Sequence, residues 1–488
     1  MRRAGVSNRC MPRTAPELLI LAMDIGTSST RSALFDQGGR RIAATSASEK
    51  YATRYTADGG AELKPEMLRR AATSCLRRTL AARARSTSLC RVPIVAIAGS
   101  GFWHSLLGLD KRGRPLTPIL TWADARCADD ARRLRERLSE AKIHARTGCM
   151  LRASFWPAKL VWLRRTRPRL FSKVARWISP AEWIFAEMFG ATGCSHSMAS
   201  ATGLYDLRMR TWDKELCRIC RVPVDLMSKI SDRSTHRSIR SELREAPVFT
   251  VIGDGAASNL GSGADGNNRV AINIGTSAAV RMIRPRGKGD VPFGLFRYEV
   301  DDKCEVIGGA ISNAGNLRAW FLRELRVDNI DMSPAAAATD PLTVLPFWVS
   351  ERAPTWPEHL QGVIAGLSQA TRAPQILRAA ITSTYYRLAD ILDLIETTSG
   401  RARQIIVSGG VAHSPASLRL LADALGRDLT NCVELEASLR GAALYGLEQI
   451  GRTHPSTPKG KMIRHNRARA AQHRLRRERQ NALEKLLR

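Results

Sequence analysis

The chain has 488 residues, of which 44% are hydrophobic and 25% are charged. This balance is ordinary for a soluble globular protein, and the length exceeds what one core normally supports, so we expect two or three domains. No apolar run approaches the roughly 20 residues that a membrane-spanning helix needs, which argues against such a helix and against a membrane partner.

The formal net charge of +31 is the unusual property of the composition. A basic surface can hold nucleic acid or an anionic membrane. The excess is spread along the chain, however, and it is densest between Arg452 and Arg488, where twelve lysines and arginines stand against two glutamates. We therefore expect only incidental nucleic-acid binding by this tail and no dedicated nucleic-acid partner.

Residues 1–17 are basic and lack the apolar stretch of a secretory signal, so they are predicted to form a disordered leader. The ten cysteines are scattered, and the pair Cys217-x-x-Cys220 has no second pair or histidine cluster at zinc spacing. Reduced, partly buried thiols in a cytoplasmic protein are the better interpretation.

The first half of the chain alternates short apolar runs with stretches of helical periodicity. The predicted strands are 18–23, 31–36 and 92–98, and the predicted helices are 65–84, 128–138, 157–164 and 180–189. The polar stretch 231–246 has few apolar residues and is the predicted connection between the two halves.

The second half begins again with an apolar run. Its predicted strands are 248–252, two strands around the string NIGTS, and 405–407, and its predicted helices are 313–325, 373–397, 415–425 and 437–450. Alternating strands and helices imply layered α/β domains. We place the domains at 18–247 and 248–450, followed by a basic tail at 451–488 that has helical spacing from Arg467 onward.

One short glycine motif occurs twice, half the chain apart. The string DIGTS at 24–28 follows the apolar run 18–23, and NIGTS at 273–277 follows 270–272. Glycine lets the backbone approach a phosphate closely, and the amides and hydroxyls of the turn can cradle the anion. Two such turns predict a duplicated fold that clamps the phosphates of a nucleotide between its halves. Alone, each string is equally typical of a hairpin with a capped turn.

Phosphoryl transfer needs positioned phosphates, Mg²⁺, and an acceptor hydroxyl held in line. Asp24 is the candidate organiser of the Mg²⁺, whereas Asn273 brings no charge. Arg31 lies just beyond the first turn and is the candidate to neutralise charge on the transferred group. The candidate phosphate-binding residues are Gly26, Thr27 and Ser28 in the first turn and Gly275 and Thr276 in the second.

The double motif resembles that of the sugar-kinase, actin and heat-shock ATPase superfamily. The wider context resembles the FGGY carbohydrate kinases, and above all those that phosphorylate gluconate. The segments that carry this resemblance run from about residue 18 to residue 447 and are GFWHSLLGLD, TWADAR, WPAKLVWL, ASATGLYD, GDGAASNLGSGA, NIGTSAAVR, VIGGAISNAGN and IIVSGG. The resemblance implies a two-domain actin-like ATPase fold of the ribonuclease H type, with ATP and Mg²⁺ in the cleft between the domains.

Asp254, in the string GDGA, comes almost directly after the apolar run 248–252 and so emerges at the carboxyl end of a strand. A carboxylate there can accept the hydroxyl proton as the acceptor attacks the γ-phosphate, and Gly255 and Ala256 leave space beside it for a sugar. An Asp-Gly pair is also an ordinary turn signal. In the family the same D-G-A string supplies the base, so the resemblance favours the catalytic interpretation.

Trp103 and His104 follow a strand and a Gly-Ser-Gly turn. Tryptophan can stack on the face of a sugar and histidine can bond to a hydroxyl, and related kinases have a substrate-contacting histidine in this loop. The alternative is a core tryptophan with a satisfied histidine beside it.

The segment TWADAR also borders the sugar in similar kinases, which makes Trp122, Asp124 and Arg126 candidates for substrate binding. Asp124 can accept hydroxyl bonds, and Arg126 can bind a carboxylate with two parallel bonds. Lys159 is a second candidate partner for a carboxylate, with a solvated helix face as the alternative.

On the nucleotide side, glycines let the adenine and ribose lie against the backbone, although any glycine pair is also typical of a plain connection. The resemblance implies that the residues that contact the nucleotide here are Gly309, Asn313, Gly315, Gly409, Gly410 and Ser414. Two positions depart from the family pattern, because Ala278 and Ser350 stand where glycine is usual. Neither removes a chemical group, so they bear on affinity more than on activity.

The resemblance implies ATP-dependent phosphorylation of a sugar acid, first of all D-gluconate to 6-phosphogluconate, in the cytoplasm. Another substrate of the family, such as xylulose or a polyol, is the first alternative, and an ATP-driven binding or scaffold protein of the actin-like superfamily is the second. Trp103, His104 and Asp254 argue against a scaffold, because a scaffold needs no sugar pocket. A homodimer is kept open as the assembly.

Overall fold

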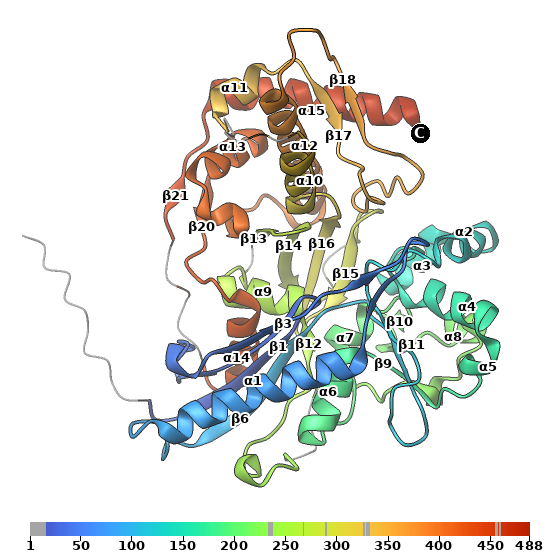
Figure 1. Ribbon diagram of the computed structural model, residues 1–488, viewed down its shortest axis with the longest axis vertical. Helices are drawn as coiled ribbons and strands as arrows, with labels where there is room; N and C mark the ends of the chain where they lie inside the picture. The colour runs from blue at the N-terminus through green and yellow to red at the C-terminus, as the bar shows by residue number, and fades with distance from the viewer. Residues whose placement is uncertain are drawn as a thin grey trace, which may run out of the picture.

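The computed structural model describes residues 16–232, 238–266, 268–287, 290–325, 327, 332–453, 457 and 460–488. Residues 1–15, most of the predicted leader, and residues 233–237 of the predicted connection lie outside this part of the chain. Figure 1 shows two lobes stacked along the long axis of the molecule, with the first half of the chain below and most of the second half above.

The sheet of the lower lobe has the strand order β12-β6-β1-β2-β3. Its central strand β1 (Leu19–Ile25) pairs antiparallel with β2 (Ser29–Phe35) and parallel with β6 (Ile94–Gly101). The edges are β3 (Ala47–Lys50), antiparallel to β2, and β12 (Ile252–Gly253), parallel to β6. The predicted strands 18–23 and 31–36 correspond to β1 and β2 and form a hairpin.

Strand β1 is a continuous apolar run because both faces of its sheet are covered. Leu21 faces one side, where α1 (Pro65–Arg85) and α6 (Pro180–Phe189) pack. Ile20 faces the other side, where α14 (Ala437–Gln449) packs. Helix α14 thus returns from the second half of the chain to the lower lobe, as Figure 1 shows.

The sheet of the upper lobe has seven strands in the order β15-β16-β14-β13-β19-β20-β21. They are β13 (Arg269–Ile274), β14 (Ala278–Pro285), β15 (Phe296–Glu299), β16 (Cys304–Ile311), β19 (Gln404–Gly409), β20 (Leu429–Asn431) and β21 (Met462–Ile463). Helices α10 (Gly315–Leu325), α12 (Ala373–Ser399) and α13 (Pro415–Leu425) share one core with this sheet, while α9 (Asp254–Ser262) also contacts its strands.

The two sheets repeat one arrangement at the position of the glycine motifs. In each, the motif's hairpin is joined by a parallel third strand, β6 in the first sheet and β19 in the second. The Ser100 hydroxyl donates to Asp24 Oδ1 at 2.6 Å, and Asn273 Nδ2 donates to Ser408 Oγ at 3.0 Å, in the same register. The duplication predicted from the two motifs is present in the fold.

The remaining elements surround these two sheets. In the lower lobe they are β4 (Arg54–Tyr55), β5 (Ala61–Leu63), β7 (Leu107–Leu109), β8 (Ile119–Leu120), α2 (Ala128–Arg137), α3 (Glu140–Thr147), α4 (Trp156–Thr166), α5 (Pro168–Phe171), β9 (Arg176–Ile178), α7 (His196–Ser200), β10 (Tyr205–Asp206), β11 (Thr211–Trp212) and α8 (Lys214–Cys220). In the upper lobe they are α11 (Pro334–Thr339), β17 (Thr343–Leu345), β18 (Val363–Ala365) and α15 (Arg467–Leu487).

Most predicted helices begin and end within a few residues of the observed ones. The predicted strand 248–252 differs, because the structure shortens it to β12 and places it in the first sheet, parallel to β6. Apolar residues alone do not say which of two sheets a strand joins. Cys217 and Cys220 are both buried free thiols on α8, and no described helix is long and apolar enough to cross a membrane.

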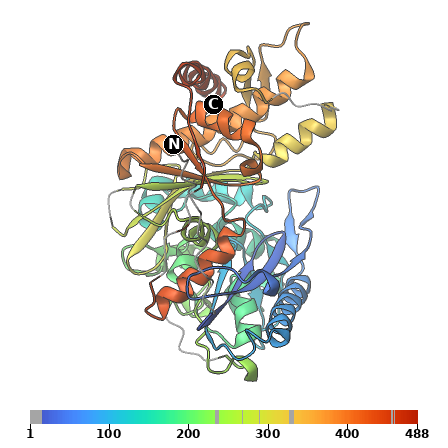
Figure 2. The same cartoon turned by 90° about the vertical axis from the view of Figure 1, so that its left-hand side faces the viewer.

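The predicted tail helix is α15, which lies at the top of the upper lobe in both views (Figure 1 and Figure 2). Arg477 on this helix pairs with Asp390 and Asp393 of α12 at 2.6 Å each. His473 is buried and bonds through Nδ1 to the Tyr386 hydroxyl at 2.8 Å. One face of the helix is therefore packed on the lobe, while several of its arginines remain exposed.

Truncation after Ile450 removes α15 and the edge strand β21. Because several buried contacts are lost, we expect the midpoint of thermal unfolding to fall by more than about 5 °C, since each kcal/mol is worth about 2–4 °C in a domain of this size. Differential scanning calorimetry of the full and truncated chains measures this. An unchanged midpoint would show that the tail is a solvated appendage.

Candidate active site

Two adjoining cavities of about 310 and 350 Å³ lie where the two glycine turns meet. Asp254, Asn273 and Arg281 line both cavities and so mark the boundary between them. The first cavity also reaches Asp24 and Gly26, and the second reaches the loop and strand residues Thr27, Ser28, Trp103, His104, Trp122, Thr276 and Arg352. Residues from both lobes therefore meet around one space.

Asp24 lies at the end of β1 and is buried, with each carboxylate oxygen engaged by a hydroxyl. Ser100 donates to Oδ1 at 2.6 Å, and Ser438 of α14 donates to Oδ2 at 2.8 Å. These neutral donors orient the carboxylate without neutralising its charge. Asp24 can therefore still attract a cation into the first cavity.

Asp24 also fits the donor set of a magnesium site. Mg²⁺ needs only one or two carboxylates when phosphates and waters complete its shell. In the described part of the chain, no group of three or more His, Cys, Asp or Glu side chains is placed to hold a metal ion. The single charged oxygen donor at the glycine turn suits Mg²⁺ held together with phosphates better than a metal held by protein alone.

Arg31, on β2 and in the wall of the same cavity, is bound to a glutamate in this structure. Its Nη1 donates to Glu436 Oε2 at 2.7 Å and lies 3.7 Å from Asp24 Oδ2. About a third of the Arg31 side chain is exposed. An anion that reached Arg31 would have to compete with Glu436 for it.

Asp254 is the first residue of α9, directly after β12, as predicted. Its Oδ1 accepts from the Gly255 amide at 2.8 Å. Burial raises the pKa of Asp254 to about 6, with the nearby Asp24 acting in the same direction and Arg281 opposing it. The carboxylate is therefore ionised at neutral pH but more basic than an ordinary aspartate, which suits a proton acceptor.

The glycines beside Asp254 have a different purpose from the one expected. A Cβ on Gly253 or Gly255 would lie 1.7 or 2.2 Å from the Trp103 ring. Both glycines therefore make room for tryptophan, while Gly255, one of the two residues expected to leave space for a sugar, also lines the first cavity. Trp103 is itself largely a core residue, because its Nε1 donates to the Ser197 carbonyl at 3.1 Å and its ring packs edge-on against Tyr298, although it also lines the second cavity.

His104 is partly buried in the wall of the second cavity and has a left-handed backbone, at φ 63°. Burial lowers its pKa to about 3, so the ring is neutral, and its Nδ1 lies 2.6 Å from the Ala201 carbonyl. A carbonyl only accepts, so Nδ1 carries the proton and Nε2 is an acceptor. Such an acceptor can receive a bond from a hydroxyl group.

Lys159 lines neither of these two cavities, and it is not on a solvated helix face. It is buried, and its Nζ donates to the carbonyl oxygens of His104 at 3.0 Å and Ser154 at 2.6 Å. Burial lowers its pKa to about 8. The structure thus gives Lys159 the role of holding the strained His104 backbone.

Trp122 lines the second cavity, but Asp124 and Arg126 from the same segment do not. The Arg126 guanidinium pairs with Asp124 at 2.5 Å and with Glu62 at 2.6 Å, and it stacks on the Trp162 ring. Both charged residues are buried in this cluster. These ion pairs give Asp124 and Arg126 a structural role that requires no bound substrate.

Two cavity residues that the sequence analysis missed are Arg281 of β14 and Arg352. Both are partly buried. Among the described residues neither lies within ion-pair distance of a carboxylate, although Asp254 acts electrostatically on Arg281 and Glu351 acts on Arg352. Burial lowers the pKa of both, to about 10 for Arg352. Arg352 Nε donates to Ser312 Oγ at 3.1 Å, and its guanidinium lies over the Trp122 ring at 4.6 Å.

Both arginines lie in sequence segments that were already compared with the family pattern. Arg281 ends the quoted string NIGTSAAVR, and Arg352 follows Ser350 in the segment where a departure from the family pattern was noted. What the sequence does not show is that these two positions, about seventy residues apart in the chain, share one wall.

A third and larger cavity of about 850 Å³ lies beyond the second glycine turn, between α10, α12 and α13. Gly275, Gly315, Gly410 and Ser414 line it, as expected for nucleotide-binding residues. A Cβ on Gly315 would lie 2.4 Å from the Gly275 carbonyl, so the backbones meet closely here. Its volume and its backbone-lined wall fit an adenosine group.

Three of the predicted nucleotide contacts lie outside this cavity. Gly409 lines the first cavity beside Asp24. Gly309 packs in the lobe, where a Cβ would lie 2.8 Å from Ala353. Asn313 donates to the Val349 carbonyl and to Glu351 at 3.0 Å each, so it supports the start of α10.

Ala278 and Ser350 replace glycine without backbone strain. Neither adopts a left-handed conformation, and Ala278 pairs regularly with Ile274 and Ile311 in the sheet. Ser350 is exposed. The structure gives no reason why either residue would weaken the site.

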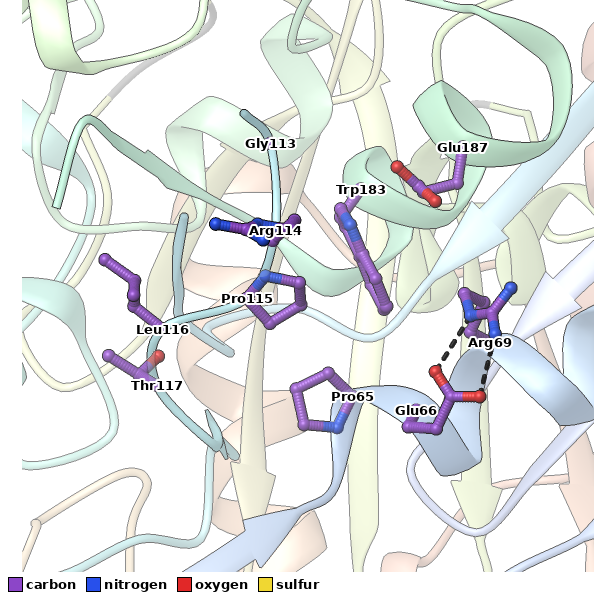
Figure 3. A pocket seen from close by; sticks show the side chains of 10 residues that line it. All are labelled: Pro65, Glu66, Arg69, Gly113, Arg114, Pro115, Leu116, Thr117, Trp183 and Glu187. Atoms are coloured by element: carbon purple, nitrogen blue, oxygen red, sulfur yellow. Dashed lines mark hydrogen bonds and ion pairs between the residues drawn. The ribbon is translucent and has the colours of Figure 1, made fainter. Parts of the chain in front are cut away.

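A separate cavity of about 440 Å³ shares no residue with the others (Figure 3). Pro65, Pro115 and Trp183 form its apolar wall, and Glu66 pairs with Arg69 at its rim. None of the residues predicted for phosphate, nucleotide or sugar lines it.

Comparison with known proteins agrees with this geometry. The N-terminal domain model of the FGGY family of carbohydrate kinases matches residues 19–261, and its C-terminal domain model matches residues 270–448. The gluconokinase of Bacillus subtilis (strain 168) is 29% identical over 459 residues, covering 89% of this chain and 88% of that protein. The xylulose kinase of Lactococcus lactis subsp. lactis (strain IL1403) is 26% identical, covering 84% and 83%.

The crystal structure of gluconate kinase from Lactobacillus acidophilus superposes with a TM-score of 0.85 at 24% identity, covering 96% of this chain and 98% of that one. The predicted two-domain actin-like fold is thereby confirmed. Since the two domain models together span most of its length, this protein belongs to the FGGY family of carbohydrate kinases.

Proposed function

We propose that this kinase transfers the γ-phosphoryl group of ATP to the terminal hydroxyl of a sugar acid, D-gluconate, in the cytoplasm. The observation that carries the proposal is the pair of partly buried arginines, Arg281 and Arg352, in the wall of the second cavity, neither of which makes a close ion pair with a carboxylate among the described residues. A buried cation without a partner is costly, and an anionic ligand would supply one. A sugar acid has the carboxylate that a neutral sugar lacks.

The residues around the boundary of the two cavities have complementary roles in this proposal. Asp254 accepts the proton of the attacking hydroxyl, and Arg281 beside it keeps the carboxylate ionised. His104 Nε2 accepts a bond from another hydroxyl, which orients the acceptor. Closure of the lobes over these groups would exclude water, which otherwise competes as acceptor.

ATP supplies the transferable phosphoryl group, and Mg²⁺ neutralises charge on its phosphates. We assign the adenosine to the 850 Å³ cavity and the phosphates to the two glycine turns. In the first cavity, Asp24 would hold the metal and Arg31, released from Glu436, would contact the phosphate oxygens.

A neutral sugar is the second candidate, because the related xylulose kinase covers nearly as much of the chain. It would bring no carboxylate of its own to Arg281 and Arg352 in the complex. A panel of gluconate, xylulose, ribulose and glycerol in a coupled ATPase assay separates the two, and a preference for a neutral sugar would contradict the gluconate assignment.

The role of Asp254 predicts both a rate loss and a pH dependence. Its pKa near 6 means that it is protonated below that pH, so kcat/KM should fall with increasing acidity below about pH 6 and stay level above it. Asp254→Asn should cut turnover by roughly 10²–10⁴ and abolish this acidic limb. ATP binding, followed by thermal shift, serves as the control for folding. Near-normal turnover in the purified variant would refute the assignment.

The role of Asp24 predicts a selective effect on the metal. Asp24→Asn keeps the shape of the side chain but removes the charge, so the Mg²⁺ concentration for half-maximal rate should rise about tenfold or more, as expected when one charge-assisted contact is lost. The KM for gluconate should change much less. A magnesium titration that overlays the wild-type curve would rule out a metal-binding role.

The two arginine clusters predict opposite outcomes. Arg352→Leu should lower kcat/KM for gluconate by roughly a hundredfold, or about 2–3 kcal/mol, and affect any neutral sugar less. Arg126→Leu should mainly lower thermal stability, because it leaves Asp124 and Glu62 buried without their cation. If Arg126→Leu alone shifted the preference toward neutral sugars, the carboxylate site would have to be reassigned.

A further inference from the structure

Glu484, near the end of the C-terminal helix α15, is a buried acid that bonds to a distant part of the chain. Its Oε2 accepts from Arg387 Nη1 of α12 at 2.5 Å, and its Oε1 accepts from the Thr355 hydroxyl and from Arg488 at 2.7 Å. Only 3% of Glu484 is exposed. A buried carboxylate does not contribute to solubility, so the role of Glu484 must lie in the bonds that it makes.

Arg387 carries the connection from α15 toward the cavity. It is fully buried and lies over the Phe347 ring. Its Nη2 donates to the Ala353 carbonyl and to Thr355 Oγ1, both at 3.0 Å. Glu484 thus neutralises an arginine that holds the backbone of segment 351–355.

Segment 351–355 contains Arg352, which lines the second cavity. The Arg352 guanidinium donates to the Ile311 carbonyl and to Ser312 Oγ at 3.1 Å each and lies over the Trp122 ring. The residue after Arg352 is bonded to the sheet, because the Ala353 amide donates to the Ala310 carbonyl of β16 at 3.1 Å. The residue next to Arg352 is therefore bonded on one side to the sheet and on the other to Arg387.

We propose that Glu484, through Arg387, positions segment 351–355 and so sets the affinity of the site for its sugar acid. The C-terminal helix is then part of acceptor recognition, although none of its residues reaches the cavity. The inference rests on the proposed function, since it takes Arg352 as a group that binds the carboxylate of the acceptor. Glu484 is a positioning residue in this scheme.

Removal of the Glu484 charge should loosen the segment without undocking the helix. Helix α15 keeps the ion pairs of Arg477 with Asp390 and Asp393, the bond from His473 to Tyr386, and that from Gln480 to the Ser383 carbonyl. Arg387, in contrast, would be left as a buried cation whose remaining bonds go to neutral oxygens. Any shift of the Arg387 guanidinium would act directly on Ala353, because Arg387 donates to the Ala353 carbonyl.

The test uses the full chain and two kinds of variant. Glu484→Gln removes the charge, and Thr355→Val removes the shared hydroxyl at less risk to folding, with Thr355→Ser as the conservative rescue. Asn481→Ala is the matched control, because it removes a bond from the same helix to Asp390, away from the segment. Each variant is assayed for KM and kcat with gluconate and ATP, and for hydrogen exchange of the peptide 346–356.

We expect Glu484→Gln and Thr355→Val to raise the KM for gluconate roughly tenfold, with kcat and the KM for ATP within about twofold of wild type, a size typical of coupling through a packed network. Exchange in 346–356 should accelerate in both variants. Thr355→Ser should behave like wild type, and so should Asn481→Ala.

Two results would overturn the inference. One is unchanged exchange in 346–356 with the same loss of thermal stability as Asn481→Ala, which would make Glu484 merely structural. The other is faster exchange with an unchanged KM for the acceptor, which would show that the segment does not position Arg352. If wild type does not use gluconate at all, the proposed function fails on that observation, and the exchange data still decide whether Glu484 orders the segment.

Discussion

The parallel pairing of a third strand with each glycine-turn hairpin is the constraint on which the site depends. It sets Ser100 beside Asp24 in the first sheet and Ser408 beside Asn273 in the second, in the same register. The glycine turn follows directly in both cases, so both turns open at the same edge of their sheets, where the cavities lie. The two matched positions differ in charge, since one holds Asp24 and the other Asn273. Only the first of the two similar halves is therefore suited to a cation.

The many arginines of the chain have different partners at the surface, in the core and at the site. Core arginines such as Arg126 and Arg387 are matched with buried carboxylates, which removes most of the cost of burying them. In the cavity wall, Arg352 lies over the Trp122 ring and donates to the Ser312 hydroxyl. Arg281 lies near Asp254 without a close ion pair among the described residues. In the proposed function an anionic ligand completes this arrangement. The same buried surroundings raise the pKa of Asp254 to about 6.

The end of the chain takes part in this architecture. Helix α14 covers the first sheet and brings Ser438 to Asp24, while α15 covers the second lobe and reaches segment 351–355 through Glu484. Of these two helices, α14 ties the second half of the chain to the lower lobe, while α15 packs on the upper lobe. The basic composition of the tail reflects a helix with a packed face, whose ion pairs reach α12, and an exposed face that carries the remaining charge.

How much could be predicted depended on the range of the interaction. The sequence by itself determined the elements, the duplication, the glycine turns and Asp254 at a strand end, because these follow from local periodicity and from backbone freedom at glycine. It could not determine that the strand before Asp254 joins the first sheet. Nor could it determine that Arg126 forms ion pairs with Asp124 and Glu62, or that Lys159 donates to backbone carbonyl oxygens. Nor could it show that Arg281 and Arg352 share a wall. Which partner a charged side chain finds is decided by packing between residues far apart in the chain, since a buried charge takes whichever counter-charge the fold brings within reach, and only the tertiary structure sets that distance.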